Sequence, residues 1–525
     1  MSANACDFFL GRHLDGSVAA RVAMLHSRGD QTYAELAEVV NRVGNYLLNL
    51  GVRPEQRIVL HLKDGPELVY FFLAAIKIGA VAVPVNTFGD IGHLAFFLSD
   101  TRAPVLVTHN TSIGKITAII QSAPFLEHVL YVEDAEWSDE SNVLDTFPAN
   151  EDDSAFWLYT SGSGGIQKAA MHSHAGMIAC ARHYPRDVLR INESDRVYSA
   201  SKMFFAYGLG NSLIFPFSAG ASCVLNSERS DPATVITILS EYRPTLFFAV
   251  PALYNQLLSS PQVDSVLFAG VRMCISAGES LSPVVFDAWY KQTGLPIYDG
   301  IGSTEAMHIF CSNRPEANIP GTSGRPVSGY ELKIVDDHGA AVAVDGIGQL
   351  VVRGETLAKG YWNQRRLNQL VFQGEWLATG DIYQQLADGY FRYVGRQDDV
   401  FKSSGLWVSP VEVEQALLSH SSVQEAAVVA TKNDNGLTVG KAFVVIKMNA
   451  DMQGEDLLKQ QIYDYLKKQL SKYKMPASVE FLSALPKTST GKIARAELRR
   501  VPSKLRTDAS AAIELGLIMH ERIEK

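Results

Sequence analysis

The sequence predicts an α/β protein with a large, multi-lobed N-terminal domain of parallel-rich sheets, a small β subdomain and a smaller α+β C-terminal domain. Three observations support this prediction. A chain of 525 residues is too long for one hydrophobic core. Short apolar runs alternate with helical patterns, which is the order that parallel sheets require. The pattern changes to short strands and turns after Gly321, and a βαβ-like pattern follows Gly405.

The alternation is clearest near the N-terminus. Apolar residues at helical spacing predict a helix over 31–50, which ends at Gly51. A strand-length run at 58–62, a helical pattern at 67–78 and another run at 80–84 then indicate a parallel βαβ unit. The same rhythm predicts four further elements: a helix near 93–98, a strand at 105–107, a helix from 112 and a strand at 128–132.

The middle of the chain continues in the same way. Predicted strands lie at 196–200, 222–225, 245–250, 273–276 and 297–300, and a predicted helix lies at 233–242. Function in such sheets usually lies at the carboxyl ends of the strands. Short strands and Gly/Asp turns then predict the β subdomain at about 321–395.

The polar, glycine-bracketed segment 395–405 is the best candidate for a domain boundary. Strands at 426–430 and 442–446 and a helix at 457–470 predict the C-terminal domain. The tail after Val501 is expected to form a peripheral helix.

Composition limits the function classes. The hydrophobic fraction of 47% and the charged fraction of 20% are typical of a globular protein. The net charge of -9 argues against nucleic-acid or anionic-membrane binding, so an anionic ligand requires a local basic patch. The cysteines are scattered and odd in number, which predicts buried thiols in a reducing compartment. No leader-like N-terminus and no apolar run of about 18 residues is apparent, so a cytoplasmic location is expected.

A glycine-rich loop at 159–169, which reads YTSGSGGIQKA, is the first candidate for a binding site. Glycine brings backbone N–H groups close to a ligand, so a Gly/Ser/Thr loop closed by a lysine suits a polyphosphate, and a nucleotide is the expected ligand. The segment after the loop, which contains His172 and His174, has a helix-like pattern. A Walker motif is absent because Lys168 lies between Gln167 and Ala169. Taken alone, the loop could equally be an ordinary strand-to-helix turn.

The loop becomes a more specific signal when it is read together with six short stretches that follow it in the sequence. They are SAGE at 276–279, DGIGSTE at 299–305, TGD at 379–381, GRQD at 395–398, KSSG at 402–405 and PKTSTGK at 486–492. Together with the loop they resemble the adenylate-forming superfamily of acyl- and aryl-CoA ligases, luciferases and peptide-synthetase adenylation domains. The resemblance covers nearly the whole chain.

Within that superfamily the chain looks most like benzoate-CoA and related aryl-CoA ligases. The similarity lies in the stretches at 202–211, 250–254 and 303–310. Amino-acid-activating relatives usually carry an aspartate near the position of Tyr207, and no acidic residue lies between Lys202 and Phe217. This favours a neutral, flat, apolar substrate body.

The resemblance implies a two-step reaction that uses ATP, Mg²⁺ and CoA. A carboxylate attacks the α-phosphate of ATP to give an acyl-adenylate and pyrophosphate, and a thiol then displaces AMP. It also implies a domain organisation of an N-terminal adenylation domain at 1–395, a hinge region at 396–405 and a mobile lid at 406–525. Asp398 occupies the hinge position, and Lys492 is expected to bridge the attacking carboxylate and the α-phosphate region.

The same resemblance assigns roles in the nucleotide site. The residues expected to hold the β- and γ-phosphates are Thr160, Ser161, Gly162, Ser163, Gly165 and Lys168. Thr304 is expected to contact a phosphate and Glu305 to bind Mg²⁺, although a helix N-terminal acid remains an alternative for Glu305. Asp381 and Arg396 are expected at the ribose. The residues expected near the adenine are Ala277, Gly278, Glu279, Asp299 and Gly300.

The acyl and thiol sites follow from the same pattern. The residues expected to line the aryl pocket are Phe204, Ala206, Tyr207, Gly278, Gly300 and His308. His308 could equally be an ordinary core histidine, and at most one of Phe204 and Phe205 can face the substrate if both lie on a strand. Gly405 is expected to line the pantetheine tunnel. Lys402 is a candidate for the thioester step, with a simple loop lysine as the alternative.

The opening loop departs from the family pattern. Gly164 replaces the usual second threonine, Gln167 the usual proline and Ala169 the usual glycine. One lost hydroxyl removes a phosphate hydrogen bond worth roughly 1 to 3 kcal/mol, so weakened or altered ATP handling is expected.

The leading functional hypothesis is an ATP-dependent aryl-CoA ligase for benzoate or a small amino- or hydroxybenzoate such as anthranilate. Its expected partners are the aromatic acid and CoA, without nucleic acid or membrane. One alternative is an enzyme that loads an aryl acid onto the phosphopantetheine arm of an acyl carrier protein. A second alternative is a non-catalytic adenylate-binding homologue, against which the intact Glu305, Asp381, Arg396 and Lys492 argue.

Overall fold

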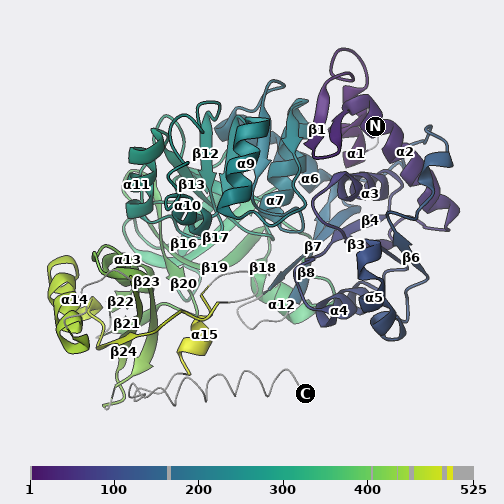
Figure 1. Ribbon diagram of the computed structural model, residues 1–525. Coiled ribbons are helices and arrows are strands. Elements are labelled where there is room, and N and C mark those ends of the chain that lie inside the picture. The colour runs from purple at the N-terminus through teal and green to yellow at the C-terminus, as the bar shows by residue number, and fades with distance from the viewer. Residues whose placement is uncertain are drawn as a thin grey trace. The chain divides into compact units, whose positions relative to one another are not determined.

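The computed structural model describes residues 3–161, 167–403, 406–433, 435–447, 454–487 and 493–500. The chain divides into two compact units, Met1–Tyr393 and Val394–Lys525 (Figure 1). The α/β fold class predicted from the alternation of strands and helices is confirmed. Within the described ranges, no helix has the length and apolar character needed to cross a membrane.

A six-stranded sheet forms the first lobe of the large unit. Its strands, in spatial order, are β6 (His128–Tyr131), β5 (Val105–Thr108), β3 (Arg57–His61), β4 (Val81–Pro84), β7 (Ser154–Ser161) and β8 (Gln167–Ser173). All neighbours are parallel except β7 and β8, which pair antiparallel. The helices of this lobe are α2 (Tyr33–Asn49), α3 (Pro66–Lys77), α4 (Ile91–Thr101) and α5 (Ile113–Ile119).

Local sequence explains where these helices begin. The Thr32 side chain accepts a hydrogen bond from the backbone N–H of Glu35, and the Glu35 carboxylate accepts one from the backbone N–H of Thr32, which is a capping box for α2. Pro66 stands in the first turn of α3, where its missing N–H costs nothing. Nearly all of α3 is buried, because it packs between α2 and the sheet.

A nine-stranded sheet forms the second lobe. Its strands, in spatial order, are β15 (Arg325–Pro326), β14 (Ile309–Ser312), β13 (Ile297–Gly302), β12 (Met273–Ser276), β11 (Leu246–Ala249), β9 (Arg196–Ser199), β10 (Ser222–Val224), β1 (Val22–His26) and β2 (Gly29–Thr32). The pairings from β13 to β1 are parallel, and those at the two edges are antiparallel.

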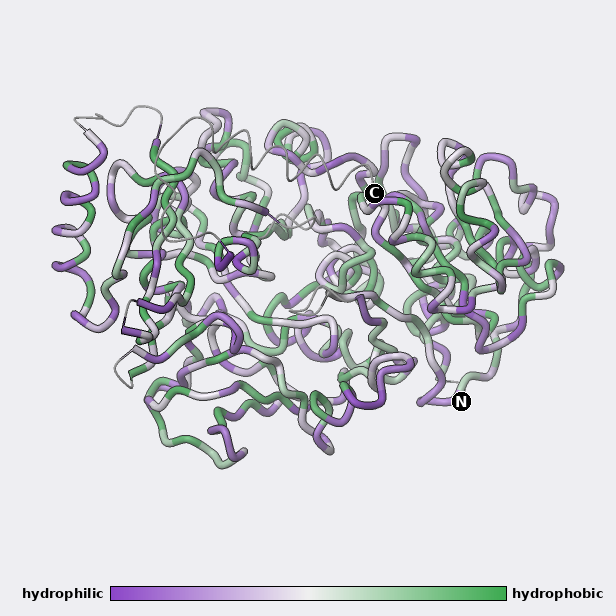
Figure 2. The backbone as a smooth tube through the Cα atoms, turned by 90° about the horizontal axis from the view of Figure 1, so that it is seen from below, coloured by the Kyte–Doolittle hydropathy of each residue, from purple (hydrophilic) through white to green (hydrophobic). Residues whose placement is uncertain are grey.

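Helices precede or connect the strands of this lobe. They are α1 (Ala5–Phe9), α6 (His174–Arg182), α7 (Ala206–Leu209), α8 (Phe215–Ala219), α9 (Pro232–Tyr242), α10 (Pro251–Leu257) and α11 (Pro283–Thr293). Figure 1 shows α9, α10 and α11 grouped beside β12 and β13. Figure 2 shows hydrophobic backbone stretches gathered inside the large unit and hydrophilic ones at its outer loops. All of the cysteines are buried with free thiols, as predicted.

An antiparallel sheet completes the large unit. Its strands are β16 (Tyr330–Val335), β17 (Ile347–Gly354), β19 (Trp376–Gln385) and β18 (Phe372–Gln373), and β20 (Phe391–Arg396) pairs with β19. One helix, α12 (Arg365–Val371), precedes β18. The small unit contains β21 (Phe401–Ser403), β22 (Leu406–Val408), α13 (Pro410–Leu418), β23 (Val423–Lys432), β24 (Thr438–Ile446), α14 (Glu455–Gln469), β25 (Ser478–Phe481) and α15 (Arg495–Leu498).

The predicted helix-like segment after the glycine loop is only partly right. His172 lies in strand β8, and helix α6 begins at His174. The buried strand β7 offers β8 a full antiparallel ladder, so pairing decides the conformation up to Ser173. There the Ser173 hydroxyl caps α6 by accepting a hydrogen bond from Gly176. The glycine loop therefore joins two antiparallel strands and is not a strand-to-helix turn.

Candidate active site

The hairpin of β7 and β8 holds the first predicted site residues. Thr160 on β7 lies opposite Lys168 on β8, and Ser161 lies opposite Gln167. The loop residues Gly162, Ser163 and Gly165 lie outside the described residues. The structure therefore places the two ends of the phosphate loop on paired strands.

Lys168 meets Glu305 and Tyr361 at the base of this hairpin. The Lys168 Nζ lies 2.7 Å from the Tyr361 hydroxyl oxygen and 3.5 Å from Glu305 Oε1. The Tyr361 hydroxyl lies 2.5 Å from the same Glu305 oxygen. Only 14% of the Lys168 side chain and 13% of the Glu305 side chain are exposed. An ammonium, a carboxylate and a phenol therefore lie together in one corner of the site that is largely shielded from solvent.

The segment 358–362 brings Tyr361 to this corner because it runs along β8. The N–H of Met171 donates to the carbonyl of Gly360 over 3.0 Å, and the N–H of Trp362 donates to the carbonyl of Ala169 over 2.9 Å. Between these bonds, Ala170 and Tyr361 form an antiparallel bridge. This pairing places Tyr361 beside the strand that carries Lys168.

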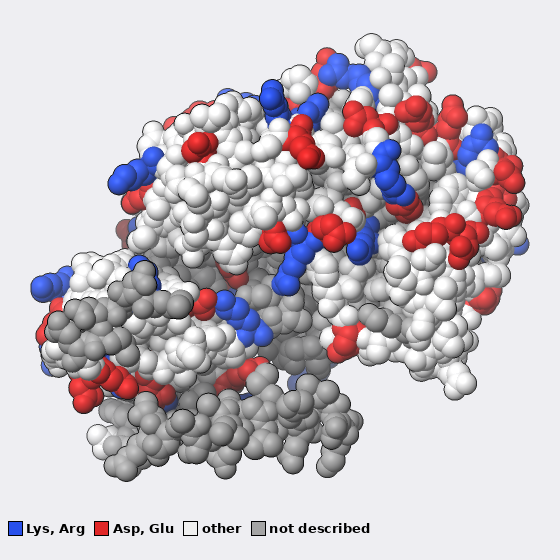
Figure 3. Space-filling view, viewed as in Figure 1, with Lys and Arg blue, Asp and Glu red and all other residues white. Residues whose placement is uncertain are grey.

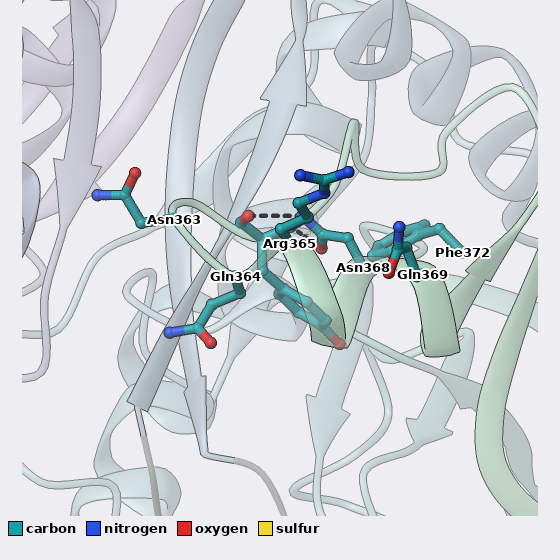
Figure 4. Close-up of a pocket in the computed structure, with 7 residues that line it drawn as sticks. Asn363, Gln364, Arg365, Asn368, Gln369 and Phe372 are labelled. Atoms are coloured by element: carbon teal, nitrogen blue, oxygen red, sulfur yellow. Dashed lines mark hydrogen bonds between the residues drawn. The ribbon is translucent and has the colours of Figure 1, made fainter.

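Asn368 of α12 clamps Tyr361 from the other side. Its Oδ1 accepts a hydrogen bond from the Tyr361 N–H at 2.7 Å, and its Nδ2 donates to the Tyr361 carbonyl at 2.8 Å. An open cavity of about 600 Å³ lies against this clamp, and Figure 4 shows its lining side chains. The lining residues are Tyr361, Asn363, Gln364, Arg365, Asn368, Gln369 and Phe372.

Glu305 fits a cation that is held mainly by a bound polyphosphate. No cluster of three or more His, Cys, Asp or Glu side chains able to hold a metal occurs among the described residues. Mg²⁺ typically binds one or two carboxylates together with substrate phosphates, so a single carboxylate beside a phosphate loop is a suitable donor set. Thr304 and Glu305 follow β13, and the Glu305 carbonyl accepts a hydrogen bond from the Ala358 N–H at 2.7 Å.

His172 lies fully buried near Glu305. Burial lowers the pKa of His172 to about 4, although the charge of Glu305 acts in the opposite direction. Its ring stacks on Phe156 with centroids 4.9 Å apart. The imidazole is therefore neutral at ordinary pH and packs as part of the core.

The predicted aryl-pocket residues Phe204, Ala206 and Tyr207 lie at the start of α7, whereas Gly278 follows β12, Gly300 lies in β13 and His308 directly precedes β14. Phe204 is 3% exposed and Phe205 is 37% exposed, so one ring turns inward and the other outward. Both lie in the turn before α7 and not on a strand, because the chain has already left β9. The Tyr207 hydroxyl donates toward the carbonyl of Ile275 at 3.3 Å.

His308 is 2% exposed and packs among aromatic side chains. Its ring centroid lies 4.4 Å from that of Phe215 and 5.4 Å from that of Tyr207. The His308 Nε2 lies 3.1 Å from the Asn211 Oδ1 and 3.3 Å from the Tyr207 carbonyl oxygen, both of which accept, so Nε2 carries the proton. Burial lowers the pKa of His308 to about 3, which keeps the ring neutral.

The predicted adenine residues lie at the carboxyl ends of β12 and β13. Ser276 and Asp299 are register partners on these parallel strands, and Ala277 to Glu279 follow directly. Gly278 has a φ of 92°, which favours glycine. A Cβ at Gly300 would lie 2.9 Å from the carbonyl oxygen of Cys311, so that position also needs glycine. Burial raises the pKa of Asp299 to about 8.

Some of the remaining predicted site residues lie within the described part of the chain and others do not. Asp381 is nearly buried on β19, and its N–H donates to the Thr379 hydroxyl at 3.1 Å. In the small unit, Arg396 ends β20 and the carbonyl of the exposed Asp398 accepts a hydrogen bond from Arg499. The Lys402 Nζ lies 4.6 Å from the centroid of the Trp407 ring. Gly405 and Lys492 lie outside the described residues.

Sequence reasoning missed two residues that organise these sites. One is Tyr361, which lies in no stretch used for the resemblance. The other is Asp64, whose carboxylate accepts from the Met203 N–H at 3.1 Å and 3.2 Å and so fixes the turn before Phe204. Because 139 residues separate Asp64 from Met203, no local sequence pattern predicts this pair.

Comparison with known proteins identifies the family of the chain. The model of the AMP-binding enzyme family matches residues 15–362, and that of the AMP-binding enzyme C-terminal domain matches residues 412–492. A benzoate–CoA ligase of Thauera aromatica is 40% identical over 505 residues, which cover 94% of this chain and 95% of the relative. An anthranilate–CoA ligase of Pseudomonas aeruginosa is 36% identical over 472 residues, which cover 87% of this chain and 89% of the relative.

Solved structures give the same result. An anthranilate CoA ligase in complex with anthranoyl-AMP superposes with a TM-score of 0.89 at 38% identity, covering 95% of this chain and 97% of that one. A benzoate CoA ligase from Burkholderia xenovorans superposes with a TM-score of 0.86 at 37% identity, covering 95% and 100%. The chain therefore belongs to the AMP-binding enzyme family, and the resemblance to adenylate-forming enzymes that its motifs predicted is confirmed.

Proposed function

We propose that the protein is an ATP-dependent aryl-CoA ligase that adenylates benzoate or a small amino- or hydroxybenzoate and then transfers the aroyl group to CoA. Pyrophosphate leaves in the first step and AMP in the second. The observation that carries the proposal is the corner of Lys168, Tyr361 and Glu305 at the base of the phosphate loop. Relatives that activate benzoate and anthranilate support the substrate class.

The first step brings two anions together, so it needs fixed positive charge and donors more than it needs covalent chemistry. Lys168 supplies a compact charge with three donors to the β- and γ-phosphate oxygens. Glu305 would hold Mg²⁺, which would neutralise phosphate charge. Thr160 and Thr304 add hydroxyl donors, and Asp381 accepts from the ribose hydroxyls.

The acyl site suits a neutral aromatic ring. Phe204, Ala206 and Tyr207 lie at its entrance turn, and no acidic side chain lies between Lys202 and Phe217 to attract an ammonium group. His308 is neutral and donates from Nε2 to groups of the protein. A flat benzoate ring with at most small polar substituents therefore matches the lining better than an amino acid.

The family pattern assigns roles in both steps to the C-terminal unit. Lys492 bridges the attacking carboxylate and the α-phosphate region during adenylation. The hinge at 396–405 then rotates the lid at 406–525, with Asp398 as its pivot, and Gly405 and Lys402 come to line the pantetheine path. The cytoplasmic location likewise remains a prediction from the sequence.

Two assays test the proposal. Pyrophosphate release should require both ATP and an aromatic acid, and a panel of ortho-, meta- and para-substituted benzoates should rank the substrates. Aroyl-CoA should then form with free CoA. Release of pyrophosphate without any acid would overturn the proposed ligase. In a competition between CoA and a carrier protein bearing phosphopantetheine, preferential loading of the carrier would establish the alternative acceptor.

A further inference from the structure

The Tyr361 hydroxyl connects the two charged groups of the proposed ATP site. The ring is 2% exposed, and the hydroxyl oxygen lies within hydrogen-bond distance of both Lys168 Nζ and Glu305 Oε1. The two charged groups themselves are 3.5 Å apart, which is longer than a normal hydrogen bond. A single hydroxyl thus stands between an ammonium and a carboxylate.

The direction of both hydrogen bonds follows from chemistry. An ammonium group can only donate, so Lys168 donates to the phenol oxygen. An ionised carboxylate can only accept, so the phenol O–H donates to Glu305. The Lys168 Nζ also lies 3.9 Å from the centroid of the Tyr361 ring, where the π face attracts the cation. The tyrosine therefore holds the lysine by two independent interactions and the glutamate by a third.

We propose that Tyr361 is a positioning residue that keeps the phosphate-binding amine and the cation-binding carboxylate apart and correctly spaced, so that nucleotide and Mg²⁺ bind together. This inference rests on the proposed function of the site. Without the hydroxyl, the ion pair that Lys168 and Glu305 already form over 3.5 Å would tighten to hydrogen-bond distance. Such a pair would have to be broken before the amine could meet phosphate or the carboxylate could meet a cation.

The hydroxyl is not what keeps Tyr361 in place. The backbone of Tyr361 is held by Asn368 and by the bridge to Ala170. Its ring packs edge-on against Phe372 with centroids 5.4 Å apart. A Tyr361→Phe variant therefore keeps the fold and the ring contacts and loses only the hydroxyl.

Calorimetric titration with ATP, in excess Mg²⁺ and in EDTA, tests the proposal without relying on turnover. We expect Tyr361→Phe to weaken binding of ATP with Mg²⁺ on the order of tenfold, because a hydrogen bond to charged groups is lost. The loss should be smaller in EDTA, where Glu305 has no cation to hold. In kinetic assays the KM for ATP and the Mg²⁺ concentration for half-maximal rate should rise, while the KM for the aromatic acid stays unchanged.

Tyr390→Phe is the matched control. Its hydroxyl donates to the Ala317 carbonyl at 3.0 Å, and the Arg325 guanidinium carbon lies 4.5 Å from its ring centroid, so it too loses a buried hydroxyl beneath a cation. It should bind ATP as the unmodified protein does. Equal ATP affinity in Tyr361→Phe and the unmodified protein would overturn the inference, and so would an equal loss in both variants.

A second variant keeps the inference testable if Tyr361→Phe impairs folding. If Tyr361→Phe lowers the melting temperature strongly, Asn368→Ala should show the same selective rise in the KM for ATP, because the clamp on Tyr361 is lost; an unchanged KM there would overturn the inference. If the unmodified protein binds ATP with Mg²⁺ but forms no aroyl-CoA, the proposed ligase fails and the inference stands or falls on the binding data alone.

Discussion

The Asp64 carboxylate accepts a hydrogen bond from the Met203 N–H, and this pair anchors the turn of the proposed aryl pocket to the lobe that contains β3. The carboxylate is fully buried, and burial raises its pKa to about 6, while the charge of Lys202 opposes the shift. Two parts of the chain that are distant in sequence thus meet at the acyl site.

Replacement of Asp64 by Ala should loosen that turn. The buried Met203 N–H would lose its acceptor, which costs about 1–3 kcal/mol of unfolding free energy. The KM for the aromatic acid should rise more than the KM for ATP. Asp64→Asn is the matched control, since an amide oxygen can still accept from Met203. Urea unfolding and steady-state kinetics check both effects, and a larger change in the KM for ATP would contradict the assignment.

Asp299 should make stability depend on pH. Its folded pKa of about 8 lies above the ordinary value of 3.8, so the folded protein keeps a proton that the unfolded chain gives up. Stability should therefore fall as pH rises from about 4 to about 8, by at most about 1.4 kcal/mol per pH unit from this group. Asp299→Asn should flatten the profile. Urea melts across this range would show parallel curves if Asp299 plays no such part.

Lys168→Ala should weaken ATP binding and pyrophosphate release. Charge-assisted hydrogen bonds to phosphate oxygens are lost, which predicts a rise in the KM for ATP on the order of ten- to a hundredfold. Lys359→Ala is a suitable control, because its exposed amine donates to the Asp152 carbonyl. Equal KM values for the two variants would remove Lys168 from the phosphate site.

Lys492→Ala should separate the two half-reactions. It should abolish adenylate formation, because the cation bridging the two reacting anions is lost, and nearly spare thioester formation from a synthetic aroyl-adenylate. Asp398→Pro should do roughly the reverse by stiffening the hinge. Single-turnover assays of each half-reaction decide this, and an equal loss in both assays for Lys492→Ala would refute its role.

Much of the fold could be predicted from the sequence because its signals are local. The runs at 58–62 and 80–84 form β3 and β4, and the helical pattern at 67–78 forms α3. Burial on one or both faces of such an element requires apolar residues at a characteristic spacing, which can be recognised in the sequence. The prediction of a helical segment that contains His172 and His174 is right only from His174 onward. The pairing of β8 with β7 is a tertiary interaction that overrides a short helical pattern.

The site could be predicted only where a motif is contiguous. Glu305 and Lys168 stand in recognisable stretches, whereas Tyr361 and Asp64 act through partners that lie far away in the sequence. Such residues become visible only when three-dimensional pairing, here the bridge between Ala170 and Tyr361, sets the distances.

The absence of a side chain at Gly210 affects which aromatic acids the proposed pocket can accept. A Cβ at this position would lie 2.2 Å from Cδ2 of His308, so the imidazole lies where it does only because residue 210 has no side chain. Any larger residue there must move the ring, and with it a wall of the proposed pocket. Substrate range in this chain could thus be retuned by a substitution at residue 210 that acts through the position of the His308 ring.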